Sequence, residues 1–172
     1  MSVFEPYKIK NLELRNGIVM APMCQYSAKD GIPNDWHTMH YLSRAHDGVG
    51  IIIVEMMNVE PKAHYRRLPR HMVHGHVLRY KRLVDAVHKT GAKIGIQIAH
   101  AGRKAEDAEE PVSSSVIAYT DKYKEPHELT TEEAEEVIEN YRLGARRTVS
   151  AHLIRHLPDD VGIHCHSVSQ FH

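Results

Sequence analysis

Short, unbroken apolar runs alternate along the chain with segments whose apolar residues recur every three or four positions. The unbroken runs predict strands buried on both faces, and they cover residues 16–23, 50–56 and 92–99. The periodic segments predict helices, and they cover residues 35–48, 78–91 and 129–149. Strand and helix therefore alternate three times, which indicates a parallel sheet or barrel with helices on its outside.

Residues that favour helix ends support these boundaries. Asp35 is the expected N-cap of the first helix, and Gly91 lies where the second helix should end. Thr130 followed by Glu133 forms a capping-box pattern ahead of the third helix. The apolar positions expected on one face of that helix are Ala134, Val137, Ile138, Tyr141 and Ala145.

The residues that follow the predicted strands are rich in polar and reactive groups. They read APMCQYS at 21–27, EMMN at 55–58 and QIAHAGRK at 97–104. In parallel α/β folds the chemistry lies at the carboxyl ends of the strands, so these segments are the expected site. A dinucleotide-binding Rossmann unit would need G-x-G-x-x-G after the first strand. This chain has Ala-Pro-Met-Cys there, which favours the barrel.

Composition narrows the classes of function. The 172 residues suit one domain with a sizeable core. Lys and Arg together number 22, as do Asp and Glu, so net charge gives no attraction to nucleic acid or to a membrane. Two cysteines, Cys24 and Cys165, are too few for a disulfide framework and favour the reducing cytoplasm. No signal peptide is recognised, and no run approaches the roughly 20 apolar residues of a membrane span.

Histidine is unevenly distributed, and nine of its fifteen copies lie in residues 62–82 and 151–172. The first window also holds seven Lys or Arg residues and no acid, which makes a nucleic-acid patch one interpretation. A metal site is another interpretation, through the pairs His74-x-His76 and His164-x-His166. No Cys or carboxylate ligand set accompanies these pairs, so no metal ligands are assigned.

Several longer stretches resemble the old yellow enzyme family, and most of all its bacterial NADPH dehydrogenases that carry a cysteine beside the flavin. They include FEPYKIKNLELRN, IVMAPMCQYS, GVGIIIVE, KRLVDAVHKTGAKIGIQIAHAGRKAE and LTTEEAEEVIENY. The resemblance spans residues 4–147 apart from 62–80. It implies a (β/α)8 TIM barrel that holds FMN at the carboxyl ends of its strands. It also implies NADPH as the hydride donor and an α,β-unsaturated carbonyl compound, such as an enone, as the substrate.

The resemblance further implies roles for individual residues. The backbone expected along the flavin ring is that of Ala21, Pro22, Met23 and Cys24. The Cys24 thiol would lie near the flavin N5 and tune its potential, and Gln97 would hydrogen-bond the pyrimidine edge. Met56 would approach the flavin from the second strand, and Tyr26 would face the substrate. Without the resemblance, Cys24 is interpreted as a buried apolar thiol and Gln97 as a partner of neighbouring backbone.

The chain departs from the family pattern at several positions. Gly17 stands where an Arg is usual, and Met56 stands where a small residue leaves room for the flavin. His164 and His166 lie where the family has two carbonyl-binding histidines, but they are two positions apart instead of three. No tyrosine follows Tyr141 to deliver the proton.

Length and residue pattern together set the expected fold. A TIM barrel takes roughly 250 residues, so we expect an α/β fold that is the N-terminal half of such a barrel, truncated near the fourth strand. Residues 1–150 would form this part, and residues 151–172 an atypical tail. Open strand edges predict poor stability or a tendency to form homo-oligomers. The missing tyrosine predicts an impaired or inactive oxidoreductase. The alternative function is that of a non-catalytic, His-rich fragment that binds metal.

The first histidine-rich window is also atypical for the family. Relatives carry Leu-Gly-Ile-Trp near the Pro-Arg-His-Met-Val of residues 69–73, and permitted codons for this stretch encode Leu-Gly-Ile-Trp when read one base later. We therefore hypothesise that residues 62–80 are translated out of frame. The coding DNA tests this hypothesis directly, because it requires two compensating insertions or deletions.

Overall fold

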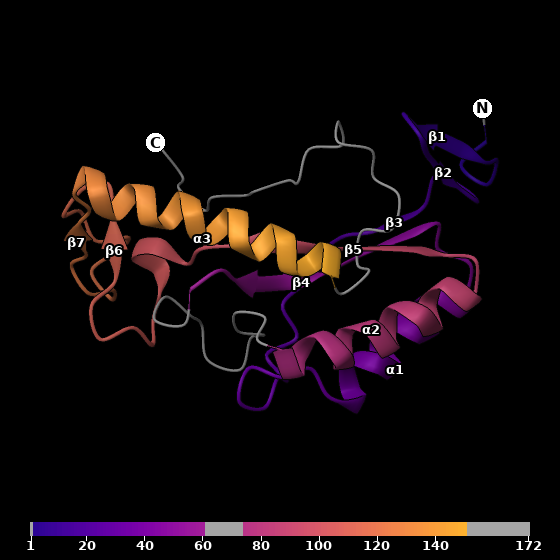
Figure 1. The fold of residues 1–172 in the computed structure, drawn as a ribbon, viewed down its shortest axis with the longest axis horizontal. Coiled ribbons are helices and arrows are strands. Elements are labelled where there is room, and N and C mark those ends of the chain that lie inside the picture. Colours follow the sequence, from indigo (N-terminus) through magenta and orange to yellow (C-terminus); the bar gives the residue numbers. More distant parts are fainter. Residues whose placement is uncertain (1, 61–73, 151–172) are drawn as a thin grey trace.

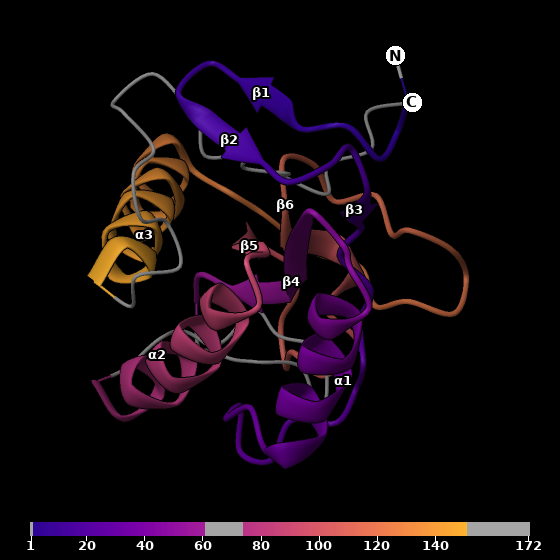
Figure 2. The same cartoon turned by 90° about the vertical axis from the view of Figure 1, so that its right-hand side faces the viewer.

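A three-stranded parallel sheet forms the centre of the structure, a computed structural model that describes residues 2–60 and 74–150. The strands pair in the order β3-β4-β5, all parallel. Three helices surround one side of this sheet in an arc (Figures 1 and 2). The elements are β3 (Val19–Met20), α1 (Asp35–His46), β4 (Ile51–Asn58), α2 (His74–Lys89), β5 (Lys93–Ala99) and α3 (Thr131–Ser150).

Two small pairs of strands lie at opposite ends of the molecule (Figure 1). An antiparallel hairpin at the amino end and a parallel pair after β5 make up these two units. Their elements are β1 (Tyr7–Ile9), β2 (Leu12–Leu14), the 3-10 helix η1 (Gly102–Lys104), β6 (Val112–Ser113) and β7 (His127–Glu128). The sequence pattern did not predict these pairs.

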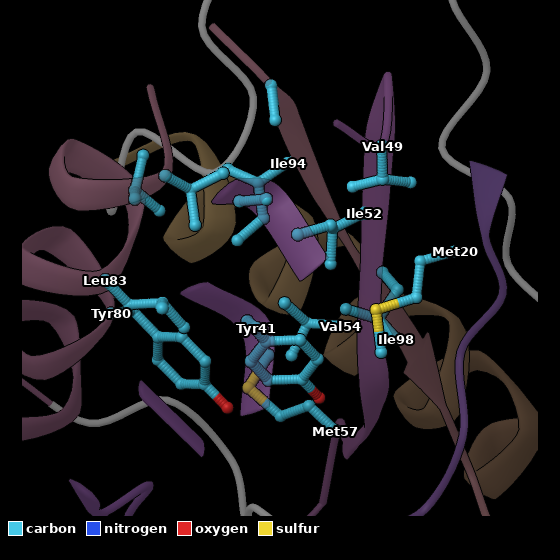
Figure 3. Close-up of a cluster of buried hydrophobic side chains, with 14 of the residues drawn as sticks. Met20, Tyr41, Val49, Ile52, Val54, Met57, Tyr80, Leu83, Ile94 and Ile98 are labelled. Carbon is cyan, nitrogen blue, oxygen red and sulfur yellow. The ribbon is translucent and has the colours of Figure 1, made fainter. Parts of the chain in front are cut away.

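The core lies between the sheet and the helices. Tyr41 from α1 and Tyr80 from α2 are both 1% exposed, and they pack with Val54 and Met57 of β4 (Figure 3). Burying each such side chain contributes roughly 1.5–3 kcal/mol. Helix α3 approaches the sheet closely at Gly144, where a Cβ would come within 3.2 Å of a Val59 methyl group.

One arginine joins the carboxyl ends of the first two helices. The Arg15 guanidinium donates hydrogen bonds to the carbonyls of Ala45 at 2.6 Å, Val49 at 2.7 Å and Thr90 at 2.7 Å. The last carbonyls of a helix have no partner within the helix. The Arg15 side chain therefore satisfies backbone carbonyls at the ends of both α1 and α2. It lies at the end of the sheet opposite the carboxyl ends of the strands.

Three local expectations are wrong. Asp35 is the first helical residue of α1, and the N-cap is Asn34, whose side chain accepts the Trp36 N–H. Only Val19 and Met20 of the predicted strand 16–23 pair with β4, because the following residues leave the sheet. Ile138 is 68% exposed and does not share the buried face of α3.

The remaining element boundaries agree with the sequence pattern to within a few residues. The Thr130–Glu133 capping box is confirmed, since the Glu133 N–H donates to Thr130 Oγ1 at 3.2 Å and the Thr130 N–H donates to Glu133 Oε2 at 2.8 Å. None of the helices in the described residues combines the length and the apolar character that crossing a bilayer requires.

Candidate functional site

The central strand carries a β-bulge near its carboxyl end. Val54 pairs with Ile96 and Met57 pairs with Ile98, so β4 has one residue more than β5 over this stretch. An extra residue reverses the alternation of side chains along a strand. Val54 and Met57 consequently both lie in the core although they are three positions apart. The two residues between them, Glu55 and Met56, are released from the alternation and do not belong to the main core cluster.

One of these released residues, Met56, lies outside the main core. It forms a separate buried cluster with Ala99 at the end of β5. Gln97 is two positions before Ala99 and therefore lies on the same face of β5. The backbone N–H of Met56 hydrogen-bonds the Cys24 sulfur. The structure thus brings Cys24, Met56 and Gln97 together at the carboxyl edge of the sheet.

The other released residue, Glu55, holds the segment that follows β3. Its side chain is fully buried, and its Oε2 accepts the Gln25 N–H at 2.7 Å. Its Oε1 lies 3.0 Å from Nε2 of His37, which is 1% exposed. The Glu55 backbone N–H donates to the Tyr41 hydroxyl at 3.0 Å. This network was missed from the sequence, because only the bulge turns Glu55 toward α1.

The network changes the acidity of the neighbouring thiol and phenols. Partial burial, followed by the charge of Glu55, raises the pKa of Cys24 above its usual value. Burial, followed by the neighbouring Cys24, raises the pKa of Tyr26, and burial raises the pKa of Tyr41. At neutral pH these three groups are therefore protonated, and the thiol is a neutral group beside a buried carboxylate.

The segment between β3 and α1 presents its residues outward at the strand edge. Ala21 is exposed, Pro22 is half-buried, and the Met23 side chain is 51% exposed. Tyr26 is also mostly exposed and has a left-handed backbone with φ of 50°. A non-glycine residue rarely adopts this conformation, so the surrounding contacts hold the turn in place.

A second carboxylate and histidine meet after β5. The Glu60 Oε2 lies 3.4 Å from Nε2 of His100, and His100 Nδ1 accepts the Gly102 N–H at 2.9 Å. Asn140 of α3 donates to the other oxygen of Glu60 at 2.9 Å. These contacts connect the ends of β4 and β5 to α3. None of the three involves Cys24.

Comparison with known proteins identifies the family. Residues 2–164 match the model of the NADH:flavin oxidoreductase / NADH oxidase family. The chain belongs to this family. The NADPH dehydrogenase of Listeria welshimeri is 43% identical over 152 residues, which cover 87% of this chain and 45% of that protein. The NADPH dehydrogenase of Geobacillus thermodenitrificans is 40% identical over 155 residues, with the same coverage.

Solved structures of old yellow enzyme relatives agree with this placement. Morphinone reductase superimposes with a TM-score of 0.77 at 27% identity, over 87% of this chain and 45% of that one. The old yellow enzyme homologue of Zymomonas mobilis covers 88% of this chain and 46% of its own at 25% identity and a TM-score of 0.77. The prediction of an α/β fold that is the N-terminal half of a TIM barrel is confirmed. The chain spans about half the length of the relatives it matches.

Two side-chain amides at the carboxyl edge of the sheet match the polar rim of a flavin. Asn58 is fully buried, yet neither atom of its amide has a hydrogen-bond partner within residues 2–60 and 74–150. Gln97 is half-buried on the same face of β5 as Ala99, the strand partner of Asn58. A buried polar group without a partner costs about 1–3 kcal/mol. A planar ligand with donors and acceptors on its rim, such as a flavin, matches these two amides.

Some predicted site residues lie outside the described part of the chain. His164 and His166 are among them, and so is most of the histidine-rich window, so the structure does not place them. Nothing in the structure tests the out-of-frame hypothesis for residues 62–80. No group of three or more His, Cys, Asp or Glu side chains that could hold a metal ion occurs among the described residues.

Proposed function

We propose that this chain supplies the flavin-binding edge of an FMN-dependent NAD(P)H oxidoreductase of the ene-reductase type. The observation that carries the proposal is that Cys24 meets Met56 at the carboxyl edge, where Met56 packs on Ala99 and Gln97 lies on the same face of β5 as Ala99. In parallel α/β folds this edge is where ligands bind. The family match and the NADPH dehydrogenase relatives support the same reaction class.

Gln97 and the segment after β3 would hold the cofactor. The Gln97 amide offers both a donor and an acceptor, as the pyrimidine edge of FMN requires. The backbone of residues 21–24 runs past the same edge and would line the ring, while Met56 would contact it from β4. When bound, FMN would take hydride from NADPH and give it to the C=C bond of an α,β-unsaturated carbonyl compound. A related structure, morphinone reductase, contains tetrahydroNAD, which supports a nicotinamide donor.

Cys24 would act on the bound ring, and Tyr26 would act on the substrate. The raised pKa of the Cys24 thiol keeps it neutral near the cofactor, where a thiolate would oppose added electron density. The Tyr26 side chain is exposed, and in this proposal it would contact the substrate. In this proposal His164 and His166 bind the carbonyl oxygen of the substrate.

We further propose that these 172 residues alone turn over poorly. The described sheet ends at β3 on one side and at β5 on the other, so unpaired backbone groups line both edges. Open edges favour association between copies of the chain, and they leave the flavin slot without its far wall. The predicted homo-oligomer would form through these edges.

Flavin binding by the purified chain tests the proposal. FMN fluorescence should be quenched as the chain is added, and NADPH should bleach the visible flavin absorbance in the absence of oxygen. Gln97→Leu should weaken FMN binding roughly tenfold, as expected for the loss of one or two hydrogen bonds. Asn11→Ala, an exposed amide change in the β1–β2 turn, is the matched control and should have no effect.

Failure of the unaltered chain to bind FMN would overturn the proposal. Retention on immobilised nickel together with ordering by zinc, without flavin binding, would instead establish the metal-binding alternative. Both measurements use the same protein preparation. The visible absorbance of bound flavin distinguishes the flavin-binding chain from the metal-binding one.

A further inference from the structure

The buried pair of Glu55 and His37 calls for a role besides stability. Removing a carboxylate and an imidazole from water costs free energy, several kcal/mol for a charged group, and their attraction offsets this only when the geometry is good. An apolar pair would hold α1 on β4 at least as well. This pair lies at the bulge, directly behind the segment that carries Cys24. Its position indicates a function in that segment.

The contacts of the pair run from the cap of α1 to the segment after β3. The backbone N–H of Asn34 donates to His37 Nδ1 at 3.1 Å, which fixes the ring on the cap of α1. Nε2 faces Glu55 Oε1 at 3.0 Å. The second carboxylate oxygen accepts the Gln25 N–H at 2.7 Å. The cap of α1 thus orients the imidazole, the imidazole lies against one oxygen of the carboxylate, and the other oxygen holds the chain one residue after Cys24.

We propose that Glu55 is a positioning residue that fixes the Cys24–Tyr26 segment over the strand edge through its hydrogen bond to the Gln25 N–H. Its carboxylate also raises the pKa of Cys24, after burial, and so disfavours the thiolate. His37 supports it by holding the carboxylate in one orientation. The consequence for flavin tuning rests on the proposed function, whereas the effect of Glu55 on the thiol is a property of the chain alone.

The groups around the sulfur are accounted for by element. Glu55 on β4 raises the pKa of Cys24 through its charge, and Cys24 in turn raises the pKa of Tyr41 on α1. Tyr26 contacts it from the same segment through a side-chain hydrogen bond. His37 lies behind Glu55 and acts on the sulfur through that carboxylate. Among these groups Glu55 acts on the sulfur by charge and raises its pKa, so removal of that charge should favour the thiolate.

The rate at which iodoacetamide alkylates Cys24, measured against pH, tests the proposal. Trypsin cleaves after Arg15 and Lys29, so mass spectrometry follows a peptide with Cys24 and without Cys165. Glu55→Gln retains an oxygen for the Gln25 N–H but removes the charge. The midpoint of the pH profile should therefore fall with an unchanged plateau, and the rate at pH 7.5 should rise roughly threefold to tenfold.

Two further variants separate charge from positioning. Glu55→Ala also removes the acceptor for the Gln25 N–H, so its plateau rate should rise as the segment loosens. Glu60→Gln is the matched control, because Glu60 pairs with His100 at the same edge without a contact to Cys24. Its profile should equal that of the unaltered chain.

A measurement on the unaltered chain keeps the test independent of how the variants fold. Its alkylation midpoint should lie above that of the same chain unfolded in urea. A midpoint equal to the urea value, or a Glu55→Gln profile that matches the unaltered one, would overturn the proposal. Neither result would bear on FMN binding, which is measured separately and decides the proposed function.

Discussion

At the scale of single residues, Asn58 is a buried amide whose two polar atoms are both unpaired within the described residues. Such a group destabilises a protein unless something completes its hydrogen bonds. Met56 precedes it by two positions, and Ala99 of β5 is its strand partner, so it lies beside the proposed flavin slot. We interpret Asn58 as a group that a ligand satisfies.

Asn58→Leu should therefore have opposite effects on stability and on ligand binding. The free energy of unfolding without FMN should rise by about 1 kcal/mol, because a buried unsatisfied amide is replaced by an apolar group of similar size. The affinity for FMN should fall. Asn140→Leu is the contrast, since the Asn140 amide already donates to Glu60 and its loss should lower stability. Urea unfolding with and without FMN measures both effects, and a destabilised Asn58→Leu would contradict the interpretation.

The predictability of the site differs from residue to residue. Cys24 and Gln97 could be found from the sequence, because they lie in distinctive stretches just after or within apolar strands. Glu55 and Asn58 could not, because their surroundings depend on a one-residue bulge. Strand alternation without the bulge would turn Glu55 away from the core face that Val54 occupies, and nothing in EMMN marks the extra residue.

At the scale of elements, short-range signals predicted boundaries well where a side chain makes the boundary. The Thr130–Glu133 box defines the start of α3 in both sequence and structure. The β1–β2 hairpin was missed because its strands have three residues each and β1 is exposed throughout, which gives no apolar alternation to detect. The single continuous strand expected over residues 16–23 ends at Met20 because the chain leaves the sheet to form the site segment.

The capping box gives a prediction for α3. Thr130→Ala removes the acceptor for the Glu133 N–H and should lower the free energy of unfolding by about 1 kcal/mol. Thr131→Ala, one residue further on at the first helical position, is the control and should change stability much less. Thermal unfolding followed by circular dichroism measures the difference. Equal losses for the two variants would show that the cap does not stabilise the helix.

At the scale of the whole molecule, the two ends of the sheet have different tasks. The amino end holds Arg15, whose hydrogen bonds join α1 and α2. The carboxyl end holds the segment with Cys24, the bulge and the amides of Asn58 and Gln97. Many barrels separate stability and chemistry in the same way, with the site at the carboxyl ends of the strands.

Arg15→Ala should accordingly destabilise the fold without acting on the site directly. Three carbonyls at two helix ends would lose a charged donor, which we expect to cost about 2–4 kcal/mol of unfolding free energy. The control is Arg82→Ala, at an exposed position on α2. Urea unfolding should separate the two variants, and a loss no greater than that of the control would refute the role of Arg15.

The most direct test of the central claim is a two-dimensional amide NMR titration of the isotopically labelled chain with FMN. The account predicts that the shifted resonances belong to residues 21–26, 55–58 and 97–100, at the carboxyl edge of the sheet. Residues near Arg15 and Gly50, at the opposite end, should remain unchanged. Shifts concentrated at that opposite end, or no shifts at saturating FMN, would contradict it.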